Sequence, residues 1–432
     1  MKLGGVRIAM VLLGLGLLGV AAVRWLNERG DDPINGVDAS APATPELIAR
    51  GAYLARAGNC MGCHTAQGGT AYAGGRGVPT PFGTIHAPNL TPDTSTGIGN
   101  WSPAEFWRAL HNGRARDGRL LYPAFPYPNY TRITRGDSDA IHAFLHSLPA
   151  VVQANKPHEL RFPFDQQAAL AVWRALYFRA AEPARPEVDL ARGPEWLRGA
   201  YLVEGLGHCN ACHASRNALG ATRNTLDLAG GLIPVQNWYA PSLISPDEAS
   251  VAAWDVQHIV DLMRTGVSAR GAVLGPMRAV VAGSTQYLTE PDLRAMAVYL
   301  KALPQTPAAP APADPRADPP ASTSSDSPGA KLYALHCVQC HGEQGEGVPG
   351  VYPALAGSRA VTLGTPVNLV HVVLEGGFPP STAGNPRPYG MPPFATVLGN
   401  DEVAQLLSHL RGSWGNRAAP VSALDVARLR GP

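Results

Sequence analysis

The pentapeptide Cys-x-x-Cys-His occurs three times in this chain of 432 residues and uses all six of its cysteines. This pattern is typical of covalent haem c attachment, in which two thiols add to the haem vinyl groups and the adjacent histidine reaches the iron. The sequence therefore predicts three covalently bound haem c groups. The predicted attachment residues are Cys60 and Cys63, Cys209 and Cys212, and Cys337 and Cys340.

Two other interpretations of paired cysteines fit this sequence less well. A structural zinc site needs four ligands, usually from two closely spaced pairs. Here the pairs begin 149 and 128 residues apart, and each has its own histidine. A dithiol redox motif would lie beside a strand–helix–strand pattern, which does not surround these segments. Because every cysteine is assigned to a haem, no disulfide is expected.

Length and composition favour a helical protein with several domains. The length predicts about three domains, one for each motif. Glycine and proline are abundant, at 47 and 41 residues, and only 16% of the residues are charged. We therefore expect an all-α fold of three tandem class I cytochrome c domains, with short helices and long loops around the haems. The formal net charge of +2 favours neither nucleic acid nor a strongly acidic partner.

Residues 1–26 predict an export segment. Lys2 and Arg7 precede an uncharged run over residues 8–23, which Arg24-Trp25-Leu26 follows. A positive start and an apolar run are typical of a secretion signal, and Trp25 resembles an interfacial anchor. We expect a retained signal anchor, an N-terminal transmembrane helix, with cleavage near residues 20–22 as the alternative. Since haem c is attached outside the bacterial cytoplasm, both interpretations place the protein on the periplasmic face of the inner membrane.

Helical patterns divide the rest of the chain. Each haem motif follows a helical pattern, at residues 45–54, 195–202 and 329–333, and each domain closes with an amphipathic helix, at 138–148, 290–303 and 401–410. Proline ends the first two closing helices. The predicted divisions are domain 1 at 45–150, a packed helical connector at 151–194, domain 2 at 195–304, a Pro/Ala-rich linker at 305–328, domain 3 at 329–415 and a tail at 416–432. The linker composition predicts an extended spacer, so we expect a separately placed third domain.

The iron ligands follow from the motifs and from the seven methionines. His64, His213 and His341 are the predicted proximal ligands. Electron-transfer haems usually have a methionine on the other side. Met391 lies in a proline-rich loop before the last helix, and Met277 occupies the corresponding loop of domain 2. We therefore expect these two methionines to be distal ligands.

The first haem differs, because Phe125 occupies the methionine position of domain 1. In that domain the internal repeat aligns the ligand loop with residues 121–127, and phenylalanine cannot bind iron. The first haem is therefore expected to be five-coordinate or to use a nitrogen ligand from elsewhere. The candidate histidines, led by His111, are His86, His111, His142 and His146.

Several further motifs resemble one protein family. They are Asn89-Leu90-Thr91-Pro92-Asp93, Gly97-Ile98-Gly99-Asn100-Trp101, the loop 121–127, Arg198-Gly199-Ala200-Tyr201-Leu202, Trp238-Tyr239-Ala240-Pro241 and Tyr389-Gly390-Met391-Pro392-Pro393. With these motifs the chain, over residues 45–415, resembles the trihaem cytochrome c subunit of bacterial membrane-bound periplasmic dehydrogenases. That family serves alcohol, gluconate, sorbitol and aldehyde dehydrogenases and nicotinate-type molybdenum hydroxylases. Phe125 resembles the branch paired with molybdenum hydroxylases, whereas the alcohol dehydrogenase branch has methionine there.

The resemblance implies an electron-transfer subunit that is not an enzyme by itself. It would pass electrons from a dehydrogenase catalytic subunit, of molybdenum hydroxylase, PQQ or flavin type, to ubiquinone or a terminal oxidase. No catalytic triad or nucleotide-binding glycine pattern stands out in the sequence. The alternatives are a peroxidase-like haem enzyme that uses an open first haem, and a sensor or storage cytochrome.

Overall fold

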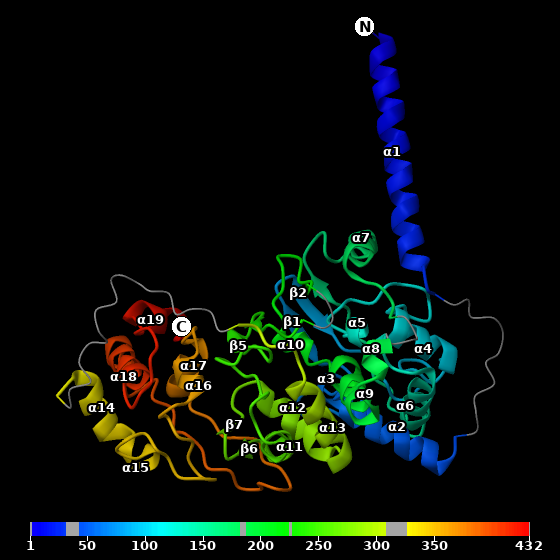
Figure 1. Ribbon diagram of the computed structural model, residues 1–432. Coiled ribbons are helices and arrows are strands. Elements are labelled where there is room, and N and C mark those ends of the chain that lie inside the picture. Colours follow the sequence, from blue (N-terminus) through cyan, green and yellow to red (C-terminus); the bar gives the residue numbers. More distant parts are fainter. Residues whose placement is uncertain (1, 32–42, 182–186, 224–226, 308–325, 432) are drawn as a thin grey trace.

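The N-terminal helix α1 (Lys2–Glu28) projects from a body in which the remaining elements gather (Figure 1). The computed structural model describes residues 2–31, 43–181, 187–223, 227–307 and 326–431. Within α1, the stretch Val6–Glu28 has 23 residues. Its apolar window has a mean hydropathy of 2.3, and none of this window is buried. By length and composition this helix can cross a membrane.

The first haem motif lies in a unit of five helices. Helix α2 begins after Thr44, whose side chain accepts a hydrogen bond from Leu47 N, and α4 begins with a capping box between Ser102 and Glu105. Such caps satisfy backbone N–H groups that have no partner within the helix. The helices are α2 (Pro45–Ala57), α3 (Cys60–Cys63), α4 (Pro103–Asn112), α5 (Tyr127–Tyr130) and α6 (Arg135–His146).

The second and third units repeat this order of elements. The second contains α9 (Pro194–Ala200), the π-helix η1 (Tyr201–Leu206), α10 (Asn210–His213), α11 (Val256–Thr265), α12 (Met277–Gly283), the 3₁₀-helix η2 (Thr285–Tyr287) and α13 (Glu290–Lys301). The third contains α14 (Pro328–His336), α15 (Val338–His341), α16 (Arg359–Thr362), α17 (Val367–Glu375) and α18 (Asn400–Gly412), and α19 (Ala423–Leu429) follows it. The connector carries α7 (Gln167–Tyr177) and α8 (Glu187–Leu190).

Short antiparallel sheets accompany the helices, so the predicted all-α fold is not confirmed. Strand β2 pairs with both β1 and β3, and two hairpins pair β4 with β5 and β6 with β7. The strands are β1 (Gly77–Thr80), β2 (Gly83–His86), β3 (Glu159–Leu160), β4 (Gly231–Ile233), β5 (Trp238–Ala240), β6 (Val267–Ser268) and β7 (Gly271–Ala272). Each strand has two to four residues, and the helices remain the main elements.

In each unit the first helix crosses the last helix at a glycine. A Cβ atom added to Gly51 would lie 1.8 Å from the carbonyl oxygen of Ala140. The corresponding distances are 2.0 Å from Gly199 to Ala295 O and 2.3 Å from Gly329 to Gln405 O. These values are far below van der Waals contact, so only glycine allows the two helix backbones to approach this closely.

The first two units exchange one tyrosine each across their interface. Tyr53 donates to Asp292 Oδ2 at 2.5 Å, and Asp292 also accepts from Arg198 of its own unit. In the reciprocal arrangement, Tyr201 donates to Asp137 Oδ2 at 2.5 Å, and Arg50 donates to the other carboxylate oxygen. The interface is therefore an approximate two-fold repeat within one chain, and both units contribute to a single hydrophobic core.

The third unit has its own core but packs directly on the second. Asn368 exchanges two hydrogen bonds with the backbone of Tyr239, at 2.9 and 2.7 Å. The ring of His371 stacks on Trp238 with centroids 5.0 Å apart, and Arg359 donates to Ser250 O at 2.7 Å. The expectation of a separately placed third domain is therefore wrong. Most of the predicted linker, residues 308–325, lies outside the described residues.

Candidate haem sites

Each Cys-x-x-Cys-His motif lies just beyond the helix that opens its unit. The first two motifs follow a residue with left-handed backbone, Asn59 (φ 48°) and His208 (φ 37°). This conformation turns the chain sharply after the opening helix, because a residue with left-handed backbone cannot continue a right-handed helix. The cysteines and the histidine then lie on the single helical turn of α3, α10 or α15 or directly beside it. The opening helices of the first two units thus deliver their motifs in the same way, whereas the third motif follows α14 without a left-handed residue.

A proline carbonyl orients the histidine of every motif. His64 Nδ1 lies 2.8 Å from Pro88 O, His213 Nδ1 lies 2.7 Å from Pro241 O, and His341 Nδ1 lies 3.0 Å from Pro353 O. A carbonyl oxygen can only accept, so Nδ1 carries the proton in all three rings. The lone pair is then on Nε2, which is the arrangement that a metal-binding histidine needs.

The protonation states of these side chains fit haem attachment. Burial lowers the pKa of His64, His213 and His341, although the proline carbonyl opposes this effect, so burial favours the neutral form of each imidazole. Burial and the neighbouring thiol raise the pKa of Cys60 and of Cys209 to about 12. Reactive dithiols have lowered pKa values instead, so the redox-motif interpretation finds no support.

The arrangement also differs from that of a zinc site. Within the ranges that the structure describes, no three His, Cys, Asp or Glu side chains gather in a way that could hold a metal ion. In each motif the histidine is held by a backbone carbonyl rather than turned toward the cysteines. One nitrogen ligand and two attachment thiols at each site match the donor set of haem c.

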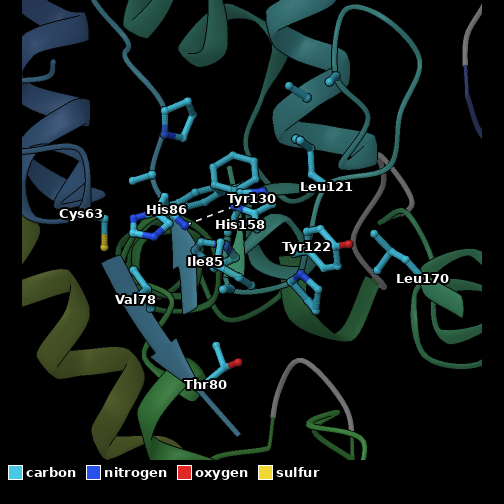
Figure 2. A pocket seen from close by; sticks show the side chains of 18 of the residues that line it. Cys63, Val78, Thr80, Ile85, His86, Leu121, Tyr122, Tyr130, His158 and Leu170 are labelled. Atoms are coloured by element: carbon cyan, nitrogen blue, oxygen red, sulfur yellow. Dashed lines mark hydrogen bonds between the residues drawn. The ribbon is translucent and has the colours of Figure 1, made fainter. Parts of the chain in front are cut away.

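A large cavity of about 1810 Å³ opens at the first motif. Cys60, Cys63 and His64 line it, together with Phe125 and Tyr130. Figure 2 shows Cys63 and Tyr130 among the side chains around this space. Ligand pockets usually have about 300–1,000 Å³, so the cavity has room for a haem and for additional volume beside it.

On the side of Phe125, this cavity offers aromatic rings rather than a methionine. The ring of Phe125 lies edge-on to that of Tyr130, with centroids 5.4 Å apart. Tyr130 is buried and donates to Gly58 O at 3.2 Å, and burial raises the pKa of its phenol well above the usual value. The phenol therefore stays neutral, and Phe125 supplies no iron ligand.

Of the four candidate histidines, His86 lines the cavity. Its backbone N–H donates to His158 Nδ1 at 3.2 Å, the dashed line in Figure 2, and its Nε2 lies 3.3 Å from Glu159 Oε1. By contrast, His142 Nε2 bonds to Trp101 O at 3.0 Å, and its ring packs at a tilt against that of His146, with centroids 4.0 Å apart. His111 stacks on Trp107. These three histidines do not line the cavity.

The two predicted distal methionines lie in segments that approach each other, one at the start of a helix and one in a loop. Met277 begins α12 and is 36% exposed. Met391 packs against the core of the third unit, and its backbone pairs with that of Gly377. A Cβ atom at Gly377 would lie 4.0 Å from the side chain of Leu274, three residues before Met277. The chain segments that carry the two methionines therefore lie close together.

Sequence reasoning missed the three prolines that orient the histidines. A signal was available, because each begins a Pro-x-Leu triplet after its motif: Pro88-Asn89-Leu90, Pro241-Ser242-Leu243 and Pro353-Ala354-Leu355. Two arginines were also missed. Arg76 donates to Gly62 O at 2.6 Å and Arg216 to Ala211 O at 2.7 Å, so each binds the backbone between the two cysteines of a motif.

The repeated motif and its histidine support define a c-type cytochrome. A model of the cytochrome c family matches residues 48–149 and 327–414. The chain is 38% identical, over 90% of its length and 85% of the relative, to the cytochrome c subunit of alcohol dehydrogenase (quinone) from Gluconacetobacter polyoxogenes. It is 37% identical to the gluconate 2-dehydrogenase cytochrome c subunit of Pantoea cypripedii, over 90% of both chains.

A third relative is a nicotinate dehydrogenase subunit from Pseudomonas putida, which is 40% identical over 86% of this chain but only 31% of its own length. The chain therefore belongs to the family of dehydrogenase cytochrome c subunits. The resemblance inferred from the sequence is confirmed, and membership implies covalently bound haem c.

Proposed function

We propose that this protein is a trihaem electron-transfer subunit of a membrane-bound periplasmic dehydrogenase complex. The observation that carries this proposal is the threefold repeat of one site, in which a Cys-x-x-Cys-His motif is combined with a proline carbonyl on the histidine Nδ1. Family membership supports it, because the similar proteins are cytochrome c subunits of dehydrogenases. The chain would perform no substrate chemistry of its own.

Different residues would have different roles in this function. Haem c supplies one-electron redox chemistry, while the protein sets spacing, ligands and polarity. The three cysteine pairs would hold the haems, and His64, His213 and His341 would be the proximal ligands. Met277 and Met391 would be the distal ligands of the second and third sites. Each site would belong to one class I cytochrome c domain, at residues 45–150, 195–304 and 329–415.

Helix α1 would place the protein on the periplasmic face of the bacterial inner membrane. Its length and hydropathy fit a membrane anchor or a signal sequence alike; a retained anchor is proposed, with a cleaved signal as the alternative. The catalytic partner would be of the molybdenum hydroxylase type, because Phe125 replaces the distal methionine, with PQQ or flavin types as alternatives. Electrons would leave to ubiquinone or to a terminal oxidase.

Purification from membranes in mild detergent, without dissociating partners, tests this proposal. Mass spectrometry and cofactor analysis should find a large subunit in stoichiometric amount with molybdopterin, PQQ or flavin. The cavity beside Phe125 favours one alternative, a peroxidase-like haem enzyme. A cytochrome that purifies alone and turns over peroxide would support that alternative and contradict the relay.

A further inference from the structure

Helix α7 has apolar side chains on its outward face. Leu170 and Arg174 point into the body and are 5% and 3% exposed, respectively. On the opposite side Val172 is 48% and Leu176 is 65% exposed, and their i, i+4 spacing places them in one stripe. A helix face in water normally carries charged or polar residues. Arg174 is the one charged residue of α7, and it is buried.

Helix α7 is fastened to the end of α1. Asn27 donates to Ala171 O at 2.9 Å, and Arg174 Nε donates to Asn27 Oδ1 at 2.9 Å. A second contact ties the end of α1 to the first unit, because Arg114 pairs with Asp31 at 2.8 Å and donates to Asn27 O at 3.0 Å. These contacts fix the position of the end of α1 relative to α7.

The directions of the two helices suit a membrane surface. In Figure 1, α1 leaves the body on the side where α7 lies, and α7 is seen nearly end-on while α1 lies along the picture. Helix α7 therefore runs across α1, as an interfacial helix would. The exposed Trp25 and the cations Arg24 and Arg29 mark the end of α1 as the level of the headgroups.

We propose that α7 lies in the outer headgroup layer of the membrane that α1 crosses, with Val172 and Leu176 inserted among the lipids. The occupant of this face is the lipid surface, because α7 is bonded to the end of α1 at Asn27 and lies on the side of the body from which α1 leaves (Figure 1). This inference rests on the proposed anchoring by α1. It gives the body a second contact with the membrane and thereby fixes its orientation. Val172, Trp173 and Leu176 also line the large cavity, so its wall would lie next to lipid.

Spin labels on the full-length holoprotein test the proposal. Single variants Val172→Cys and Leu176→Cys are labelled and reconstituted in phosphatidylethanolamine–phosphatidylglycerol vesicles. Collision with oxygen, which is enriched in lipid, is compared with collision with a water-soluble nickel chelate. Leu335→Cys on α14, where the native side chain is 73% exposed, is the matched control. Leu13→Cys reports on α1, where the native leucine is 65% exposed.

We expect an oxygen-to-nickel ratio several-fold higher at positions 172 and 176 than at 335, and highest at 13. A ratio at 172 and 176 equal to that at 335, with position 13 in lipid, would overturn the interfacial helix and leave the anchoring intact. Low collision with both reagents at 172 and 176 would also overturn it, since a protein partner would then cover the face. A water-exposed position 13 would instead contradict the anchoring itself.

Discussion

At the scale of single residues, Phe125 is the side chain that most distinguishes the first site from the others. It lines the same cavity as His64 but cannot bind iron. Carbon monoxide binds ferrous haem only where a coordination position is free. We therefore expect one of three haems in the reduced protein to bind carbon monoxide, and Phe125→Met to abolish this binding and raise the potential of that haem. Difference spectra and a redox titration measure both effects.

The control for this variant is Phe144→Met, another phenylalanine of the first unit that packs against the shared core. It should leave carbon monoxide binding unchanged. A wild-type protein that binds no carbon monoxide would contradict the open site and would point to an internal nitrogen ligand, with His86 as the histidine that lines the cavity.

The exchanged tyrosines are a second feature at this scale. Tyr53→Phe removes one hydrogen bond to the largely buried carboxylate of Asp292, and bonds to charged groups contribute about 1.5–3 kcal/mol. We expect the free energy of unfolding of the holoprotein to fall by about that amount in a denaturant titration. Tyr287→Phe, at a tyrosine that is 49% exposed, is the control. If both variants lowered the free energy of unfolding equally, the result would contradict a stabilising contact between Tyr53 and Asp292.

The same contact has a pH dependence. Burial raises the pKa of Asp292, but hydrogen bonds from Arg198 and Tyr53 outweigh this effect and hold it below its usual value of 3.8. A lowered carboxyl pKa contributes stability above the unfolded pKa and loses it as pH falls through the folded pKa. The difference in the free energy of unfolding between wild type and Tyr53→Phe should therefore become smaller at acidic pH.

At the scale of elements, the helix crossings depend on glycine. Gly51→Ala would force the backbones of α2 and α6 apart, because the new Cβ would lie 1.8 Å from Ala140 O. Overpacking costs about 1–3 kcal/mol, so the melting temperature should fall. Gly136→Ala, within α6 itself, meets nothing within 4 Å and should be neutral or stabilising because alanine favours a helix. If Gly51→Ala had the same melting temperature as Gly136→Ala, the result would contradict the close approach of α2 and α6 at Gly51.

Local sequence signals predicted the helices well, but they did not predict the pairing of strands that are far apart in the sequence. The closing helix expected at 290–303 is α13 (Glu290–Lys301), and the proline that follows it is visible in the sequence. The connector expected to be helical at 151–194 contains α7 (Gln167–Tyr177). The sheet was missed because β2 pairs with β3, more than 70 residues away, and strands of two to four residues carry little periodicity.

At the scale of the whole molecule, the three sites form one connected body. The first two units share a core and exchange tyrosines, and the third packs on the second through Trp238, Tyr239 and Asn368. The composition of the linker wrongly indicated a separate third domain. Composition carries no information about a contact surface that forms only after the units have folded. The number of motifs and their order, in contrast, could be read directly.

Each of the three repeated sites is proposed to hold one haem that takes part in electron transfer. A reductive titration of the purified holoprotein, combined with a measurement of its intact mass, tests this proposal. We predict three haem additions to the mass and the uptake of three electrons by each chain. Fewer than three covalently bound haems, or a haem that accepts no electron, would contradict the relay.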